Sequence, residues 1–233
     1  MKTILLKFAG PLQSWGTDSR FETRSAGRYP SKSAVTGILA ASFGYLRDDT
    51  RINRFNQLDY AVRVDQPGEL LSDYHVARKL KPNGNVDQVY VTNRYYLEDA
   101  VFVVALGSDD GQWMNEIEYA LKHPYFQPFL GRRSNPLTAD FFIGTKNKDT
   151  IASLESLEWQ ASEWYKRKNK GRTMLSIYAD AHLIEGSPRQ MVRDRAVSFS
   201  QRERLHDYRA VGRKDIVVMP HGDATGHDAF NAF

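Results

Sequence analysis

Apolar and polar residues alternate over residues 3–9, which predicts a half-buried first strand, because side chains of a strand point to its two faces in turn. From Ser31 the apolar positions instead recur every three or four residues. This spacing predicts a helix capped by Ser31 or Ser33. Alternation returns over residues 60–65, and residues 100–106 are continuously apolar, as expected of a strand buried on both faces.

The segment between the last two strands is less apolar and contains Pro82-Asn83-Gly84-Asn85, whose Asn-Gly pair is a strong hairpin signal. We therefore expect a projecting β-hairpin. A second helix should start at Asp109 or Asp110 and end before Pro124. Further along, the pattern predicts a helix over residues 150–165, a basic loop over 166–172, strands over 174–179 and 196–199, and a loose tail over 221–233.

The predicted order of elements indicates an α+β fold. Strand, helix, strand, hairpin, strand and helix follow one another, and one more strand would complete a split βαβ, ferredoxin-like arrangement. RNA-recognition domains share this arrangement, although the sequence signature of a standard RNA-recognition motif is absent. The order of elements alone therefore does not establish RNA binding.

The composition narrows the functional classes. The chain has 233 residues, 41% hydrophobic and 26% charged, which argues against wholesale disorder. No apolar run approaches the roughly 18 to 20 residues that cross a bilayer, so we expect no membrane association and a cytoplasmic protein. Without cysteine, disulfides, thiolate zinc sites and thiol nucleophiles are excluded. The six histidines lack metal-binding spacing, and we expect neither a metal nor a cofactor.

Positive charge is concentrated in three stretches, although the net charge is only +4. Residues 20–54 carry seven basic side chains against three acidic ones, residues 166–172 carry five against none, and residues 189–213 carry seven arginines against three acids. Such clusters suit a polyanion, because each phosphate contact releases counterions. The alternative is an ordinary solvated surface.

The loop before the first helix is the first candidate site. Arg24, Arg28, Lys32 and Ser33 lie before or within the first helical turn, where unpaired N–H groups and the helix dipole favour phosphate. Trp15 in the same loop could stack on an unpaired base. It could equally plug the adjoining core.

The segment over residues 125–137 is the second candidate. Gly131 would let the backbone approach a ligand closely, Arg132 and Arg133 supply guanidinium donors, and Ser134 adds a short polar group. The motif lacks the spacing of a nucleotide-hydrolysing P-loop or a dinucleotide fold. The alternative is a tight surface turn with two solvated arginines.

Catalysis has one candidate location. Tyr74 and His75, with Arg78 and Lys79, are the only place where groups suited to acid–base RNA cleavage cluster within a basic segment. We favour a structural or contact role for His75 over a catalytic one. The nucleophile motif GxSxG is absent as well.

Four blocks of the sequence, over residues 5–16, 21–49, 96–106 and 129–144, resemble the CasD family, the RAMP-type subunit of the type I-E CRISPR surveillance complex Cascade. They read LLKFAGPLQSWG, FETRSAGRYPSKSAVTGILAASFGYLRDD, YLEDAVFVVAL and FLGRRSNPLTADFFIG. The resemblance spans residues 3–144 in order and is loose beyond residue 145.

The resemblance implies a ferredoxin-like (RRM-like) RAMP domain over residues 1–144, with an inserted β-hairpin thumb at about 70–98, and a small β-rich region over 145–233. It implies a non-catalytic subunit that grips the 5′ handle of the CRISPR RNA. Its partners would be CasC-like backbone subunits, a CasA-like large subunit and, indirectly, target DNA. The expected RNA-binding residues are Gln13, Trp15, Arg24, Arg28, Lys32, Ser33, Tyr74, His75, Gly131, Arg132, Arg133 and Ser134.

Two other functions remain open at this point. A related subunit of type I-C systems is an endoribonuclease, so the chain could instead process precursor CRISPR RNA without a metal. Alternatively, it could be an adaptor whose basic clusters contact acidic protein surfaces.

Overall fold

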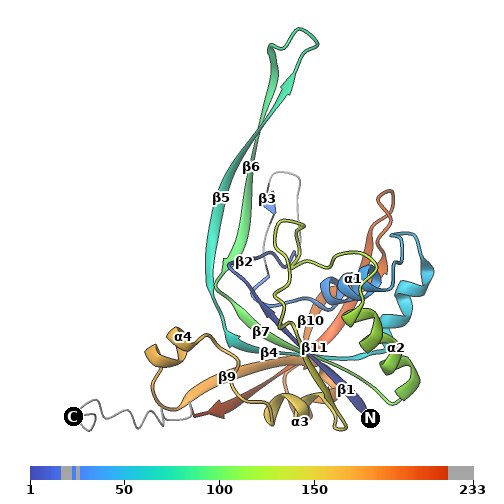
Figure 1. The fold of residues 1–233 in the computed structure, drawn as a ribbon, viewed down its shortest axis with the longest axis vertical. Helices are drawn as coiled ribbons and strands as arrows, with labels where there is room; N and C mark the ends of the chain where they lie inside the picture. Colours follow the sequence, from blue (N-terminus) through green and yellow to red (C-terminus); the bar gives the residue numbers. More distant parts are fainter. Residues whose placement is uncertain (17–22, 25–26, 220–233) are drawn as a thin grey trace, which may run out of the picture.

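The computed structural model describes residues 1–16, 23–24 and 27–219. Its centre is a seven-stranded sheet in which every strand is antiparallel to its neighbours. A long two-stranded ribbon rises from this body (Figure 1). The fold is therefore mixed α/β with a mostly antiparallel sheet. In spatial order, the strands are β10 (Gln190–Ser198), β11 (Leu205–Val218), β9 (Thr173–Asp180), β4 (Asp59–Gln66), β7 (Val101–Ser108), β1 (Lys2–Ala9) and β8 (Phe142–Lys146).

Strand β1, which lies between β7 and the edge strand β8, is buried on both faces, so the prediction of a half-buried strand was wrong. Ile4 and Phe8 on one face join the larger core with helices α1 (Lys32–Ser42) and α2 (Gly111–Lys122). Leu5 on the other face packs with Leu154 of α3 (Thr150–Glu155). The alternation came from the polar Thr3 and Lys7, which lie on the same face as Leu5. A short helix from far along the chain covers that face.

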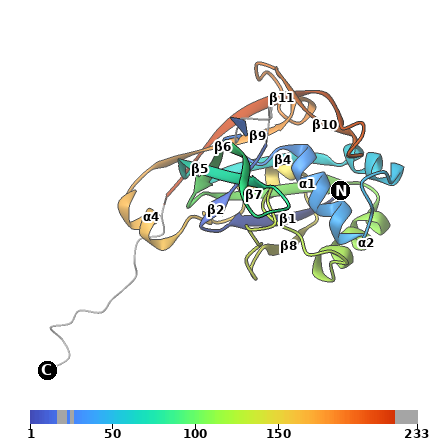
Figure 2. The ribbon, with the colours of Figure 1, turned by 90° about the horizontal axis from the view of Figure 1, so that it is seen from above.

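The two longer helices confirm the sequence predictions. Helix α1 (Lys32–Ser42) is capped by Ser31, whose Oγ accepts from Ala34 N at 3.3 Å. Helix α2 (Gly111–Lys122) is capped by Asp110 and ends before Pro124. Seen from above, both lie at one end of the sheet, and α4 (Glu163–Lys168) lies at the other (Figure 2). A 3-10 helix, η1 (Thr50–Gln57), was not predicted.

The predicted hairpin consists of β5 (Glu69–Leu80) and β6 (Val86–Glu98), and we call it the thumb. Its turn includes Gly84, whose φ of 82° suits the Asn-Gly signal. The other edge of β6 pairs with two short strands near its foot, antiparallel β2 (Leu12–Gln13) and parallel β3 (Thr23–Arg24). The loop of the first candidate site is therefore fastened to the base of the thumb.

The C-terminal strands extend the same sheet at the edge of β4. Strands β9 and β10 were predicted, β10 only in part, and β11 was not. A second 3-10 turn, η2 (Ala181–Leu183), follows β9. The predicted tail over 221–233 lies outside the described residues.

The prediction of one helix over residues 150–165 was wrong. Two short helices, α3 (Thr150–Glu155) and α4, occupy this stretch, and α4 includes the start of the predicted basic loop. The segment between them is held by Arg63, which is fully buried and paired with Asp65. Arg63 donates to the carbonyls of Leu154, Leu157 and Glu158. The helix ends where these carbonyl oxygens accept hydrogen bonds from the buried Arg63 guanidinium. The sequence pattern over residues 150–165 does not indicate this contact, because Arg63 is distant in the chain.

No helix in the described ranges is long and apolar enough to cross a bilayer.

Candidate nucleic-acid interface

The loop that contains Gly131 packs directly on the chain after β2. Ser14 N donates to Leu130 O at 3.1 Å, and a Cβ on residue 131 would lie 1.7 Å from Ser14 O. Gly131 also has a φ of 81°, a conformation that favours glycine. We expected this glycine to allow close approach of a ligand. The structure corrects that expectation, because the close approach is to the protein's own backbone.

The residues after Gly131 differ in their exposure. The Arg132 guanidinium lies 4.4 Å from the centre of the Tyr96 ring, and it donates to Tyr96 Oη at 2.9 Å and to Ser14 Oγ at 3.2 Å. Arg133 and Ser134 are exposed, and Arg133 has no ion pair among the described residues. Arg132 is thus oriented by an aromatic ring and two hydroxyls, while Arg133 offers a free charge beside it.

The loop before α1 returns to the same place. Gly27 N donates to Trp15 O, next to the residue that contacts the Gly131 loop. Arg28 follows directly, is exposed and has no ion pair within the described ranges. Arg24 lies in β3, opposite Arg94 of β6, but its side chain falls outside the described part of the chain. The contacts through residues 14 and 15 bring the two candidate loops together at the foot of the thumb.

Gln13 and Trp15 have structural contacts that leave no accessible surface. Trp15 stacks on Phe8 with ring centres 5.5 Å apart, and its Nε1 donates to Gln13 Oε1 at 3.0 Å. Gln13 Nε2 donates to the carbonyls of Ala100 and Phe8. Direct RNA contact by these two side chains is therefore corrected to a positioning role: they fasten the loop to the sheet.

Lys32 is also buried, contrary to its predicted contact with RNA. Its Nζ donates to Asp180 Oδ2 at 3.0 Å and to the carbonyls of Leu58 and Asn56 at 2.7 and 3.1 Å. Burial lowers the pKa of Lys32, and the charge of Asp180 opposes this shift. The Lys32 ammonium group therefore pairs with the internal carboxylate of Asp180 and does not contact a phosphate.

The N-terminus of α1 already holds an anion. Asp194 Oδ2 accepts from Lys32 N at 2.9 Å, and the Asp194 carboxylate also receives Nε and Nη2 of Arg209 at 2.9 and 2.7 Å. Ser33 is half-buried, with its Oγ 3.3 Å from Ser31 Oγ. The expected phosphate at this helix end is therefore corrected as well, because a side chain of β10 occupies the position.

Tyr74 and His75, the catalytic candidates from the sequence, lie on the thumb but cannot act together. Consecutive residues of a strand face opposite sides, and Tyr74 and His75 are neighbours in β5. Tyr74 is 66% exposed. His75 Nδ1 is buried and has no hydrogen-bond partner among the described residues. Arg78 lies on the face of Tyr74 and Lys79 on the face of His75. Each is four residues further along the strand, a distance of about 13 Å.

Arg94 and Tyr96 of β6 belong to this surface but were not predicted. Arg94 pairs in register with Asp73 and lies beside Arg24 of β3, and its Nε is buried without a partner in the described ranges. Tyr96 carries Arg132. Both lie within a segment whose sequence pattern predicts only a strand of the hairpin. Their place in this surface depends on the fold, which brings residue 132 next to them.

No group of three or more metal-ligating side chains exists within the described part of the chain.

Comparison with known proteins gives consistent matches. The profile of the family described as CRISPR-associated protein (Cas_Cas5) matches residues 3–212. The chain is 37% identical over 161 residues to the CRISPR system Cascade subunit CasD of Escherichia coli (strain K12), covering 61% of this chain and 70% of that protein.

Solved structures agree with this result. A chain of a CRISPR RNA-guided surveillance complex superposes with a TM-score of 0.76 at 28% identity, over 93% of this chain and 90% of that one. A crystal structure of a Cas protein superposes with a TM-score of 0.64 at 28% identity, over 94% and 98% of the two chains.

Proposed function

Because this chain belongs to the CRISPR-associated Cas5 family and is a CasD-type subunit of a type I-E Cascade complex, we propose that it is a non-catalytic RNA-binding subunit. It grips the 5′ handle of the CRISPR RNA and caps the filament of backbone subunits that supports DNA targeting.

One observation carries the proposal: two loops that are distant in sequence meet at Ser14 and Trp15, and each presents an exposed arginine there. Arg28 follows the Gly27 contact, and Arg133 follows the Gly131 contact. Both guanidinium groups lack an acidic partner among the described residues, so each is available to a phosphate. We call this surface, formed by residues 27–28 and 131–134 at the foot of the thumb, the cradle.

The fold supports a ferredoxin-like RAMP core over residues 1–144. Strands β1, β4, β7 and β8 lie in the order β4-β7-β1-β8, with α1 after the first strand and α2 after the third. This is the order of a split βαβ unit. The thumb, over about residues 70–98, is inserted between its second and third strands, and the region over 145–233 adds three strands to its edge.

Unpaired handle bases would be read above the cradle. Sequence-specific RNA recognition targets unstacked bases, which stack on aromatic rings and present their edges. Tyr74 offers an exposed ring on the thumb, and the buried, unpartnered Nδ1 of His75 and Nε of Arg94 lie in the same ribbon. Arg132 and Ser134 complete the proposed contacts, and Gly131 fixes the position of the loop that carries them.

The thumb also supports a protein partner. A two-stranded ribbon is marginally stable in water, and exposed apolar surface of this kind marks an interaction site. We propose that a CasC-like backbone subunit covers it in the assembled particle, and that a CasA-like subunit and target DNA are further partners through the particle. The exposed apolar residues are Leu70, Leu71, Tyr74, Val76, Leu80, Val86, Val89, Tyr90 and Val91.

The thumb geometry supports the non-catalytic assignment. General acid–base catalysis requires both groups within hydrogen-bond reach of one scissile phosphate. Tyr74 and His75 face opposite sides of β5. Incubation of the purified chain with a repeat hairpin RNA in EDTA should leave the RNA intact. Site-specific cleavage that His75→Ala abolishes would instead establish the endoribonuclease.

The proposal is tested by charge reversal in the assembled particle. Arg28→Glu/Arg133→Glu should reduce co-purifying guide RNA at least tenfold, because two phosphate contacts become repulsive. The matched control is Lys148→Glu/Arg167→Glu, which reverses two exposed charges, one in the loop before α3 and one in α4. Full guide retention in the cradle variant would reject RNA gripping and favour the protein adaptor.

A further inference from the structure

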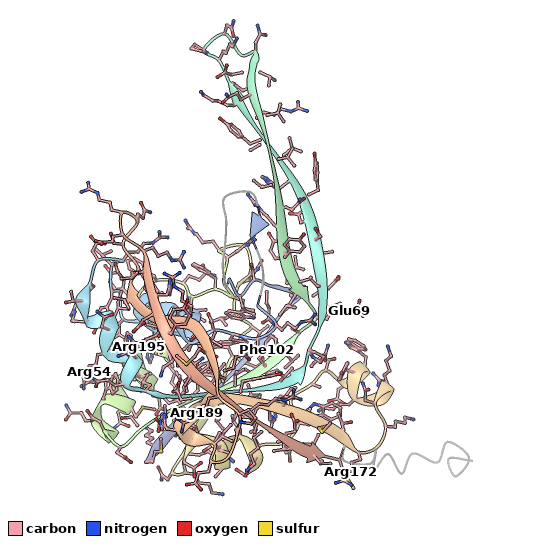
Figure 3. The ribbon with its side chains drawn as sticks, turned by 180° about the vertical axis from the view of Figure 1, so that it is seen from behind. Arg54, Glu69, Phe102, Arg172, Arg189 and Arg195 are labelled. Atoms are coloured by element: carbon pink, nitrogen blue, oxygen red, sulfur yellow. The ribbon has the colours of Figure 1, made fainter. Side chains whose placement is uncertain are left out.

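The C-terminal hairpin of β10 and β11 forms an edge of the central sheet. Its segment, residues 189–213, contains seven arginines against Asp194, Glu203 and Asp207. Arg189 and Arg195 lie along this hairpin, across the body from Glu69 at the foot of the thumb (Figure 3). This surface is therefore separate from the foot of the thumb.

Two of the seven arginines are neutralised within the protein. Arg209 is buried between Asp180 and Asp194, with N–O distances of 2.7 to 2.9 Å. Arg213 pairs with Asp215 at 3.0 Å. These ion pairs hold the hairpin on α1 and on the sheet, so they fix its position and contribute no free charge.

The charges of the other five arginines are mostly not compensated by carboxylates of the described residues. Within the described residues, Arg189, Arg202 and Arg204 have no ion pair, and the nearest acidic contact of Arg195 is Asp207 at 3.9 Å. Arg193 donates to a carbonyl, His206 O, at 3.1 Å. Within residues 189–213, only Glu203 and Asp207 remain to balance these five cations. Their mutual repulsion persists unless an external anion compensates it.

A hollow of about 410 Å³ opens beside two of these arginines, Arg189 and Arg195. Its lining also contains Tyr208, the buried Lys32, Arg209 and Asp180, and Asp59, whose Oδ1 lies 2.8 Å from His182 Nε2. Tyr208 is 57% exposed and has no ring partner among the described residues. A hollow of this volume is within the range of small-ligand sites, and arginines beside an exposed aromatic ring are the usual features of a surface for unpaired nucleotides.

We propose that the β10–β11 hairpin is a second phosphodiester-binding surface, which holds a single-stranded RNA segment with backbone phosphates on Arg189, Arg195, Arg202 and Arg204 and a base on Tyr208. Strand β10 is about 30 Å long, enough for several nucleotides. The identity of the ligand as RNA rests on the proposed function, whereas the surface itself does not include the cradle.

The experiment measures binding of the full-length chain to a fluorescein-labelled single-stranded RNA of 30 nucleotides over a salt series. Arg189→Gln/Arg195→Gln and Arg202→Gln/Arg204→Gln should each lower the slope of log K against log salt by about 1.4, since each lost contact with a single strand removes about 0.7. At 50 mM salt the corresponding loss is about eightfold per contact. Lys146→Gln/Lys148→Gln, at two lysines outside the three basic stretches, is the control of equal charge and should keep the parent slope.

The outcomes separate this inference from the proposed function. If the hairpin variants match the control while Arg28→Gln/Arg133→Gln weakens binding, the second surface is rejected and the cradle stands. If the hairpin variants weaken binding and the cradle variant does not, the second surface stands and the cradle is rejected. A parallel titration with duplex DNA of equal length completes the test: hairpin variants that weaken only duplex binding overturn the assignment to single-stranded RNA.

Discussion

Replacing Lys32 by Met should destabilise the protein strongly and leave the salt dependence of RNA binding unchanged. The substitution removes the ammonium from Asp180 Oδ2 and from two carbonyls, all at 2.7 to 3.1 Å. Removing one partner of a buried ion pair costs about 3 to 5 kcal/mol. Asp180 keeps Arg209 Nη1 and Tyr60 N, both at 2.9 Å, so we expect the lower end, about 3 kcal/mol.

Urea denaturation measures this loss directly. With a slope of about 3 kcal/mol per molar urea, the midpoint should fall by about 1 M. Arg28→Met is the matched control: it also replaces a cation by methionine, at an exposed site four residues away. It should shift stability by less than about 0.5 kcal/mol and should lower the salt slope by about 0.7. If Lys32→Met instead keeps the parent midpoint and lowers the salt slope, the buried network is wrong and Lys32 contacts RNA.

The remaining predictions concern the glycine loop and the C-terminal hairpin. Gly131→Ala should lower the free energy of unfolding by more than about 2 kcal/mol in urea denaturation and weaken RNA binding, because its Cβ would meet Ser14 O. Gly84 has a nearly identical φ but open space around it, so Gly84→Ala should cost only about 1 kcal/mol of backbone strain. Equal losses of stability in the two variants would contradict the contact with Ser14. Burial, with the charges of Arg204 and Arg193, holds the pKa of His206 below its ordinary value of 6.5. Below that pH the unfolded chain therefore binds more protons than the folded one, so the free energy of unfolding should fall as the pH drops through 6.5. His206→Phe should remove this pH dependence. An unchanged pH dependence in the variant would refute its assignment to His206.

The sequence predicted the elements whose signals are local. Ser31 and Asp110 cap their helices as expected, and the Asn-Gly pair forms the turn of the thumb. These features depend on residues within a few positions of one another. Families of similar sequence then supplied what the order of elements alone did not, namely the link to CRISPR complexes.

Predictions failed where distant residues decide the outcome. The loop before α1 and the first turn of that helix have the sequence pattern of an anion site. In the fold, however, Asp180 pairs with Lys32 and Asp194 binds the N-terminus of the helix, and both lie about 150 residues further along the chain. Trp15 reads equally well as a stacking platform and as a core residue, and contact with Phe8 and Gln13 decides for the core. Charge in a sequence shows where cations are, but not which of them the fold has already neutralised.

The most direct measurement is ultraviolet crosslinking of a handle-labelled guide RNA to this subunit in the assembled particle, with the crosslinked peptides identified by mass spectrometry. Handle nucleotides should crosslink to peptides that contain residues 27–28 and 131–134, and the peptides around Lys148 and Arg167 should stay unmodified. Handle crosslinks that occur only on α3 and α4, with none at the foot of the thumb, would contradict the cradle.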